Sequence, residues 1–182
     1  NAVETWNEPE GGFGANLPAD QMMPGAKAMR YGLYRAAPAV KLGAAGFTSI
    51  APSGNYHRTA AKNGLLDNAD FVSFHTYGDA ESLITLTRQY REWLAANGKS
   101  GMPLRLTEVS RVAWDNFRTG EESLKIAAEL EMQAAVGRAV GLEQLYFFAY
   151  YELKEGNKTF GFLAPDRTPR LSFAAFLQSV RR

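Results

Sequence analysis

The sequence contains no cysteine and only two histidines among its 182 residues. The absence of cysteine excludes disulfide bonds and thiolate metal sites. Charge of one sign is not in excess either: 20 basic residues face 19 acidic ones, the net charge is +1, and the two signs are well mixed. Because a nucleic acid or an anionic membrane surface requires a basic patch or run, we expect neither as a partner.

Long apolar runs and nucleotide-binding motifs are missing as well. No run approaches the roughly 18 apolar residues that span a bilayer, so no membrane span is expected. The chain has no G-x-G-x-x-G or Walker phosphate loop. Gly11-Gly12-Phe13-Gly14 follows a turn instead of opening a helix, and we interpret it as a flexible active-site loop. We expect no cofactor and no metal. Localisation stays open, and a secreted or periplasmic protein fits the sequence.

What remains is the composition of an ordinary globular domain. Hydrophobic residues make up 46% of the chain and aromatic residues 12%, which suffices for one domain with a sizeable core over residues 1–182. Five short segments are apolar and rich in β-branched or aromatic residues, as strands are. These predicted strands are Val3–Trp6, Val40–Ala45, Phe71–Phe74, Leu104–Thr107 and Leu145–Tyr150.

Segments with helical periodicity separate the strands. Asp79 is the expected N-cap of one helix, and Thr119-Gly120-Glu121-Glu122 is a capping-box pattern at the start of another. One face of the helix after Asp79 carries Leu83, Leu86, Tyr90, Trp93 and Leu94, which we assign to the core. The predicted helices are Met22–Ala37, Arg58–Leu66, Asp79–Asn97, Thr119–Arg138 and Ser172–Val180.

Strands that alternate with helices indicate βαβ units and a parallel sheet. The strands start about 30 to 40 residues apart, and a (β/α)8 barrel averages roughly 31 residues per unit. We therefore expect an α/β fold, an incomplete (β/α)8 TIM barrel in which five strands are present. The rest of the barrel would come from an N-terminal segment outside this chain or from another chain. A five-stranded doubly wound sheet is the alternative.

Two glutamates stand where predicted strands end. Glu8 follows the first strand within Trp6-Asn7-Glu8-Pro9, and Glu108 follows Leu104–Thr107. In a parallel barrel the carboxyl ends of the strands form the active-site face. Two carboxylates placed there are the minimum machinery for cleaving a glycosidic bond with retention. Each glutamate alone would also suit an ordinary polar strand end.

A third strand end lies between these two. His75 and Tyr77 are related as i and i+2, so both side chains can point the same way from an extended chain. A tyrosine hydroxyl beside a carboxylate can hold it ionised and oriented. Tyr56 and His57, after the second predicted strand, are weaker candidates for reaching the same cleft.

Together these motifs resemble clan A of the glycoside hydrolases, which are retaining (β/α)8-barrel enzymes. The matching segments are Trp-Asn-Glu-Pro after one strand, His-x-Tyr two strands later and Thr-Glu one strand after that. The five strands would then be strands four to eight of such a barrel. Tyr150–Leu153, Phe160–Leu163 and Thr168–Arg170 resemble the strand-eight ending of family 39-like and family 5-like members. The resemblance covers nearly the whole chain.

The resemblance implies a retaining β-glycoside hydrolase that acts on a β-linked oligo- or polysaccharide through a covalent glycosyl-enzyme. Glu8 would be the general acid and base, and Glu108 the nucleophile. Asn7 would hydrogen-bond the sugar 2-hydroxyl. Tyr77 would orient Glu108, and His75 would contact substrate or the carboxylate network.

Two aromatic residues are expected to contact the sugar rings. Tyr150 stands where clan members commonly carry a tryptophan, and Trp114 is a candidate for a leaving-group subsite. Clan members also draw polar residues from the early strands, so this chain alone is expected to be inactive.

Three further hypotheses stay open beside hydrolysis. Transglycosylation would use the same residues. A carbohydrate-binding or scaffold barrel would keep the fold without the chemistry. An unrelated α/β enzyme on an open sheet would make the two glutamates incidental.

Overall fold

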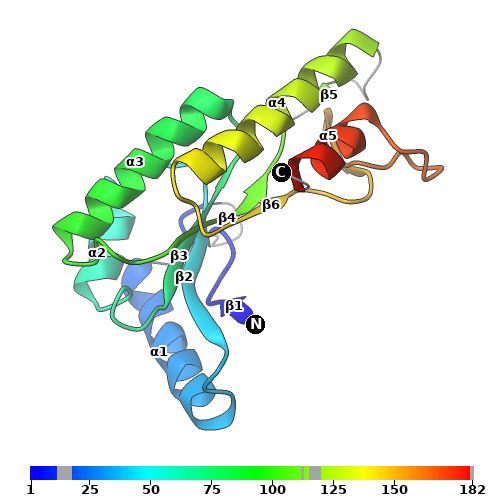
Figure 1. Ribbon diagram of the computed structural model, residues 1–182. Helices are drawn as coiled ribbons and strands as arrows, with labels where there is room; N and C mark the ends of the chain where they lie inside the picture. The colour runs from blue at the N-terminus through cyan, green and yellow to red at the C-terminus, as the bar shows by residue number, and fades with distance from the viewer. Residues whose placement is uncertain (12–17, 112, 115–119, 181–182) are drawn as a thin grey trace. The chain divides into compact units, whose positions relative to one another are not determined.

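A computed structural model describes residues 1–11, 18–111, 113–114 and 120–180 (Figure 1). Two compact units can be distinguished. Unit 1 consists of Asn1–His75 and Thr85–Thr107, and unit 2 consists of Thr76–Ile84 and Glu108–Arg182. Each unit has its own packing, and each holds one of the two candidate glutamates.

Strands and helices alternate along most of the chain, as Figure 1 shows. The elements in order are β1 (Ala2–Glu4), α1 (Ala19–Ala36), β2 (Lys41–Phe47), α2 (Asn55–Lys62), β3 (Phe71–Thr76), α3 (Ala80–Ala96), β4 (Leu104–Val109), β5 (Ala113–Trp114), α4 (Gly120–Ala139), β6 (Gln144–Phe147), β7 (Leu153–Glu155), β8 (Lys158–Phe160) and α5 (Leu171–Val180). No helix within the described ranges is long and apolar enough to cross a membrane.

The order of the strands identifies the fold class. The main sheet has the order β1-β2-β3-β4-β6, so each new strand of this sheet is added beside the previous one. β1, β2 and β3 pair in parallel. A doubly wound sheet reverses its strand order at a switch point, and no reversal occurs here. The chain is therefore an α/β fold with five consecutive strands of a (β/α)8 barrel, as the sequence predicts.

Burial explains the strands of unit 1. All six residues of β3 are buried, as expected for a parallel strand that is covered on both faces. Its alternate residues face opposite sides: the ring of Phe74 stacks on Tyr90 of α3 at a centroid distance of 4.6 Å, whereas Ser73 donates from its hydroxyl to the carbonyl of Ala45 on β2 at 2.7 Å. His75 is two residues beyond Ser73 and so shares its side of the strand.

The helices of unit 1 pack through their apolar faces. Met22 and Met23 are buried near the start of α1. Tyr56 of α2 donates from its hydroxyl to the sulfur of Met22 at 3.4 Å, and both helices lie on the same side of β2 in Figure 1. The predicted core face of α3 is also confirmed, because every one of its members is buried: Leu83, Leu86, Tyr90, Trp93 and Leu94.

Unit 2 has a separate core formed by α4, α5, β6 and the segment that follows β8. Ile126 and Leu130 of α4 pack with Phe162, and three half-buried phenylalanines surround them: Phe147, Phe173 and Phe176. Arg170 closes the C-terminal loop, because its guanidinium donates to the Glu152 carboxylate and to the carbonyls of Gly161 and Leu163. Two of the segments noted in the sequence, Phe160–Leu163 and Thr168–Arg170, are thus joined by hydrogen bonds in the loop that leads into α5.

The structure differs from the sequence prediction mainly in short strands. A second sheet of order β5-β8-β7 is antiparallel and was not predicted, because strands of two or three residues leave no periodicity to detect. β4 extends through Val109, so Glu108 lies inside the strand instead of after it. β1 ends at Glu4 and β6 at Phe147, earlier than predicted. Asp79 caps α3 as predicted, since its carboxylate accepts the Ser82 N–H at 2.8 Å.

Candidate active site

Glu8 lies on a turn after β1, and its backbone conformation is unusual. Its φ of 45° is in the left-handed region, which residues other than glycine rarely adopt. Two backbone hydrogen bonds hold the turn: Glu8 N–H donates to the carbonyl of Gly46 at 2.7 Å, and Gly11 N–H donates to the carbonyl of Glu8 at 2.9 Å. Left-handed residues held this way are frequent at functional sites.

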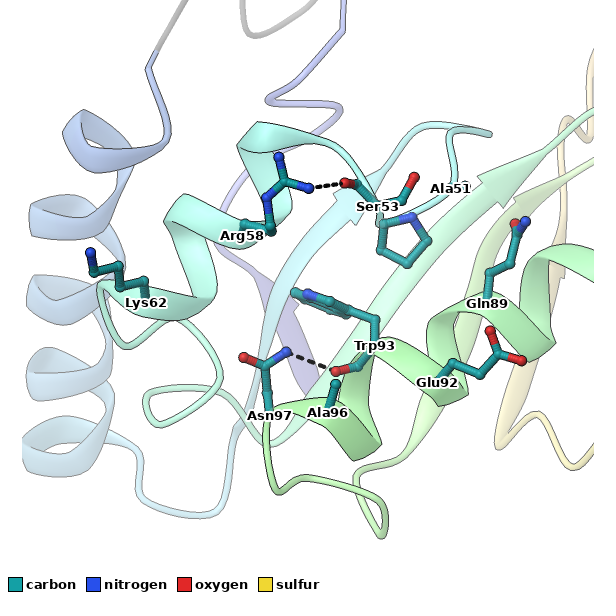
Figure 2. A pocket seen from close by; sticks show the side chains of 10 residues that line it. Ala51, Ser53, Arg58, Lys62, Gln89, Glu92, Trp93, Ala96 and Asn97 are labelled. Carbon is teal, nitrogen blue, oxygen red and sulfur yellow. Dashed lines mark hydrogen bonds between the residues drawn. The ribbon is translucent and has the colours of Figure 1, made fainter.

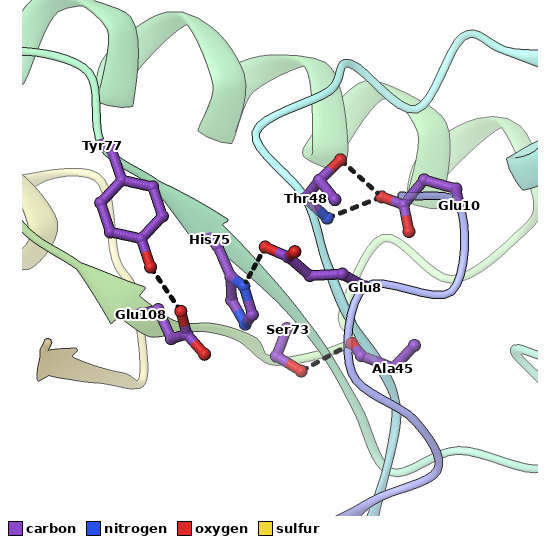
Figure 3. Close-up of polar contacts among 8 residues, drawn as sticks. All are labelled: Glu8, Glu10, Ala45, Thr48, Ser73, His75, Tyr77 and Glu108. Atoms are coloured by element: carbon purple, nitrogen blue, oxygen red, sulfur yellow. Dashed lines mark hydrogen bonds and ion pairs between the residues drawn. The ribbon is translucent and has the colours of Figure 1, made fainter. Parts of the chain in front are cut away.

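The side chain of Glu8 is directed at His75. Its Oε1 lies 2.9 Å from Nδ1 of His75, and the histidine is almost completely buried while Glu8 keeps 18% of its side chain exposed (Figure 3). A buried imidazole at the end of β3 thus holds one oxygen of a partly exposed carboxyl group.

Gly46 of β2 makes room for this pair. A Cβ atom at position 46 would lie 2.8 Å from Nε2 of His75 and 3.1 Å from a carboxylate oxygen of Glu4. Any side chain here would push the imidazole away from Glu8. A glycine inside a strand often marks such a close approach, so Gly46 is a signal in the sequence that the predicted motifs do not include.

Glu108 has a different partner in unit 2. The hydroxyl of Tyr77 donates to its Oε2 at 2.5 Å (Figure 3). Tyr77 is itself held in place, because Arg111 donates to its carbonyl at 3.3 Å and its ring contacts Phe148 and Phe160 at centroid distances of 6.2 and 5.4 Å. The two phenylalanines were not predicted, since only the fold brings them to Tyr77.

The remaining predicted site residues are placed as follows. Asn7 is exposed on the turn before Glu8, and its backbone bridges to Gly46 of β2. Tyr150 is half exposed, with its ring 4.9 Å from that of Tyr151. The backbone of Trp114 belongs to β5, but its side chain lies outside the described part of the chain, as do Gly12, Phe13 and Gly14 of the expected loop.

His57 does not reach a cleft, and that expectation is wrong. It is buried on α2, where its ring lies 4.5 Å from Phe47 and 5.5 Å from Trp93 between centroids. This burial lowers the pKa of His57 to about 4. The residue is therefore a neutral part of the aromatic core of unit 1. Burial likewise raises the pKa of its neighbour Tyr56 to about 12, with a smaller contribution from the negative charge of Glu10.

A cavity of about 830 Å³ lies between α2 and α3 in unit 1 (Figure 2). Its polar side chains do not converge on one point. Arg58 donates to the carbonyl of Ser53 at 2.7 Å, and Asn97 donates to the carbonyl of Trp93 at 2.8 Å. None of the predicted catalytic residues lines this cavity, so its size does not make it the active site.

Glu8 and His75 are the paired polar groups in unit 1, and Glu108 and Tyr77 are the paired polar groups in unit 2. The chemistry available is that of a carboxyl group beside an imidazole in unit 1 and a carboxyl group beside a phenol in unit 2. Both combinations suit proton transfer or charge stabilisation.

Comparisons with solved structures show the fold. Over 98% of its length the chain resembles a glucosidase from Croceicoccus marinus, at 20% identity and a TM-score of 0.79. It resembles a family 39 glycoside hydrolase from Bacteroides cellulosilyticus over 98% of its length, at 18% identity and a TM-score of 0.70. A family 128 endo-β-1,3-glucanase from Amycolatopsis mediterranei is similar over 96% of this chain and 70% of its own, at 17% identity and a TM-score of 0.66.

The chain spans 40% of the length of each of the first two proteins. No family model matches its sequence, and no curated protein does. The expected resemblance to clan A is thus confirmed at the level of the fold: the chain has the fold of the corresponding part of these glycoside hydrolases.

Proposed function

We propose that Glu8 and Glu108 are the acid/base and the nucleophile of a retaining β-glycoside hydrolase. The observation that carries the proposal is that each glutamate has its own hydrogen-bonding partner at the end of β3. His75 lies 2.9 Å from Glu8, and Tyr77 donates to Glu108 at 2.5 Å. The proposed acid/base is paired with an imidazole, and the proposed nucleophile is paired with a phenol hydroxyl.

The covalent chain itself ties the two partners together. Only Thr76 separates His75 from Tyr77, and two residues of extended chain span about 7 Å. In an extended chain, residues i and i+2 point to the same side. We therefore propose that the two carboxyl groups have the separation of about 5–5.5 Å that a retaining mechanism requires.

The first chemical step follows from these roles. The Glu108 carboxylate attacks the anomeric carbon and forms a glycosyl–enzyme ester, while the bond from that carbon to the leaving oxygen breaks. Glu8 gives its proton to the leaving oxygen. The Tyr77 hydroxyl donates to the attacking carboxylate and orients it.

In the second step Glu8 is a base. It takes a proton from water, the water oxygen attacks the anomeric carbon, and the Glu108 carboxylate leaves. The contact with His75 keeps the Glu8 carboxyl group in place during both steps. Asn7 would hold the sugar 2-hydroxyl, and Tyr150 and Trp114 would supply aromatic surface for sugar rings.

Structural relatives support the substrate class. The solved structures of similar fold include a β-xylosidase from Caulobacter crescentus and the endo-β-1,3-glucanase. Both names denote action on β-linked saccharides. We therefore propose a β-linked oligo- or polysaccharide as the substrate, hydrolysed by the protein as it occurs, including any residues beyond this chain.

A trapped intermediate tests the proposal. A fluorinated β-glycoside with a good leaving group slows the second step, so the glycosyl–enzyme should accumulate and add one sugar mass to the peptide that contains Glu108. Proton NMR of the first product should show the β-anomer. An α-anomer would mean inversion. Saccharide binding with neither label nor product would favour a binding or scaffold protein.

A further inference from the structure

The turn that carries Glu8 is attached to the next strand through Glu10. One carboxylate oxygen of Glu10 accepts two hydrogen bonds from Thr48, at 2.6 Å from the backbone N–H and at 3.0 Å from the hydroxyl (Figure 3). Thr48 directly follows β2. Since Glu10 is two residues beyond Glu8, this contact restrains the turn from which the Glu8 side chain extends.

Packing at Gly11 strengthens the same attachment. A Cβ atom at Gly11 would lie only 2.6 Å from Cγ2 of Thr48, so the turn fits against Thr48 because residue 11 has no side chain. Thr48 thus contacts the turn through its N–H, its hydroxyl and its methyl group. A β-branched residue has few rotamers, which makes it a stiff anchor.

The carboxyl group of Glu10 is partly removed from solvent. Burial raises the pKa of Glu10, the negative charge of Glu8 adds to the rise, and the hydrogen bonds from Thr48 act against it. Its Oε2 is buried without a hydrogen-bond partner among the described residues. Tyr56 of α2 and Tyr90 of α3 also face its charge. A half-buried carboxyl group with one buried, unpartnered oxygen calls for a role beyond stability.

We propose that Glu10 is a positioning residue for the acid/base. Held by Thr48, it keeps the left-handed turn at Glu8 in one conformation, so that the Glu8 carboxyl group meets the leaving oxygen at a constant place. The inference rests on the proposed role of Glu8. Its consequence can be large, since a misplacement of about 1 Å can lower a rate about 10²-fold.

A comparison of rates on two substrates distinguishes a positioning role of Glu10 from a general structural role. Phenyl and dinitrophenyl β-glycosides of one sugar, glucose or xylose, share the sugar and the aromatic ring, but only the phenolate leaving group needs a proton on its oxygen. In the protein as it occurs, Glu10→Ala should lower kcat/KM for the phenyl glycoside by about 10–100-fold and for the dinitrophenyl glycoside by less than about 3-fold. Glu92→Ala removes an exposed glutamate of α3 and is the control.

The conservative variant isolates the hydrogen bonds. Glu10→Gln keeps an oxygen for both Thr48 donors, so kcat/KM for both substrates should stay within about 3-fold of wild type. Thr48→Val removes only the hydroxyl bond and should slow the phenyl glycoside alone, by about 2–5-fold. It tests the inference even if Glu10→Ala does not fold.

The outcomes distinguish this inference from the proposed function. Equal losses on both substrates in Glu10→Ala, no loss at all, or no recovery in Glu10→Gln would overturn the positioning role. Glu8→Ala is measured beside them. If Glu8→Ala spares the dinitrophenyl glycoside while Glu10→Ala affects neither substrate, only the positioning role fails. If Glu8→Ala shows no preference, the acid/base assignment itself is wrong.

Discussion

The two glutamates are mounted in different ways. Glu108 is the fifth of six residues in β4, so the strand backbone fixes its direction, and the Tyr77 hydroxyl donates to its side chain. Glu8 lies outside regular structure on a left-handed turn, and contacts from separate segments hold it: Gly46 at the backbone, His75 at the carboxyl group and Thr48 through Glu10.

This difference predicts how easily substitutions elsewhere displace each glutamate. A residue in a strand inherits its position from the ladder of the sheet, and few neighbours can displace it. A residue on a turn depends on each of its tethers. Substitutions far from the chemistry should therefore disturb Glu8 more than Glu108, and the following experiments test that contrast.

The largest effect is expected at the nucleophile. Glu108→Gln in the protein as it occurs should lower kcat on the order of 10⁴-fold or more, because a glutamine amide cannot act as the nucleophile that forms the covalent intermediate. Initial rates on an aryl β-glycoside measure the loss, and circular dichroism checks that the variant is folded. A rate within 10-fold of wild type, by the same order-of-magnitude reasoning, would refute the assignment.

The effect of removing the acid/base should be smaller than the effect at Glu108, and azide should partly restore turnover. Glu8→Ala should slow hydrolysis of a natural saccharide by about 10²–10⁴-fold. Azide needs no base to attack the glycosyl–enzyme, so it should raise the turnover of an activated substrate and give a glycosyl azide. Glu92→Ala should behave like wild type. Failure of azide to change rate or product would argue against Glu8 as the base.

Low pH should destabilise unit 1 because His57 becomes protonated. Its folded pKa is about 4 against an ordinary value of 6.5, so between these values the unfolded chain binds the proton and the folded chain does not. Stability is then complete above pH 6.5 and falls by about 3 kcal/mol as the pH drops to 4. Urea unfolding between pH 7 and 4, in wild type and His57→Gln, should show a shallower pH dependence in the variant; equal slopes would contradict it.

The smallest of these effects concerns Tyr77. Tyr77→Phe keeps the ring against Phe148 and Phe160 but removes the hydroxyl that donates to Glu108. A hydrogen bond to a charged group contributes about 1.5–3 kcal/mol, so kcat/KM should fall roughly 10–150-fold. Tyr34→Phe, on an exposed tyrosine of α1, is the matched control. Equal kinetics in the two variants would separate Tyr77 from the reaction.

Local patterns predicted most of the regular structure because they have local causes. The helix after Asp79 was predicted with its cap and its core face, since both depend on residues three or four positions apart. β5, β7 and β8 were missed because pairing with distant partners, rather than their own two or three residues, makes them strands. His57 was misjudged for a similar reason: its burial depends on Phe47 and Trp93, which come from other elements.

By itself the sequence determined which chemical groups stand at the strand ends and in what order: Glu8, then His75 and Tyr77, then Glu108. Tertiary structure decided which of them meet, because contacts across 67 and 31 residues depend on strand pairing and not on local pattern. It also assigned Gly46, Glu10 and Thr48 their places around Glu8. Their contacts exist only after β1 and β2 lie side by side, which no short-range periodicity encodes.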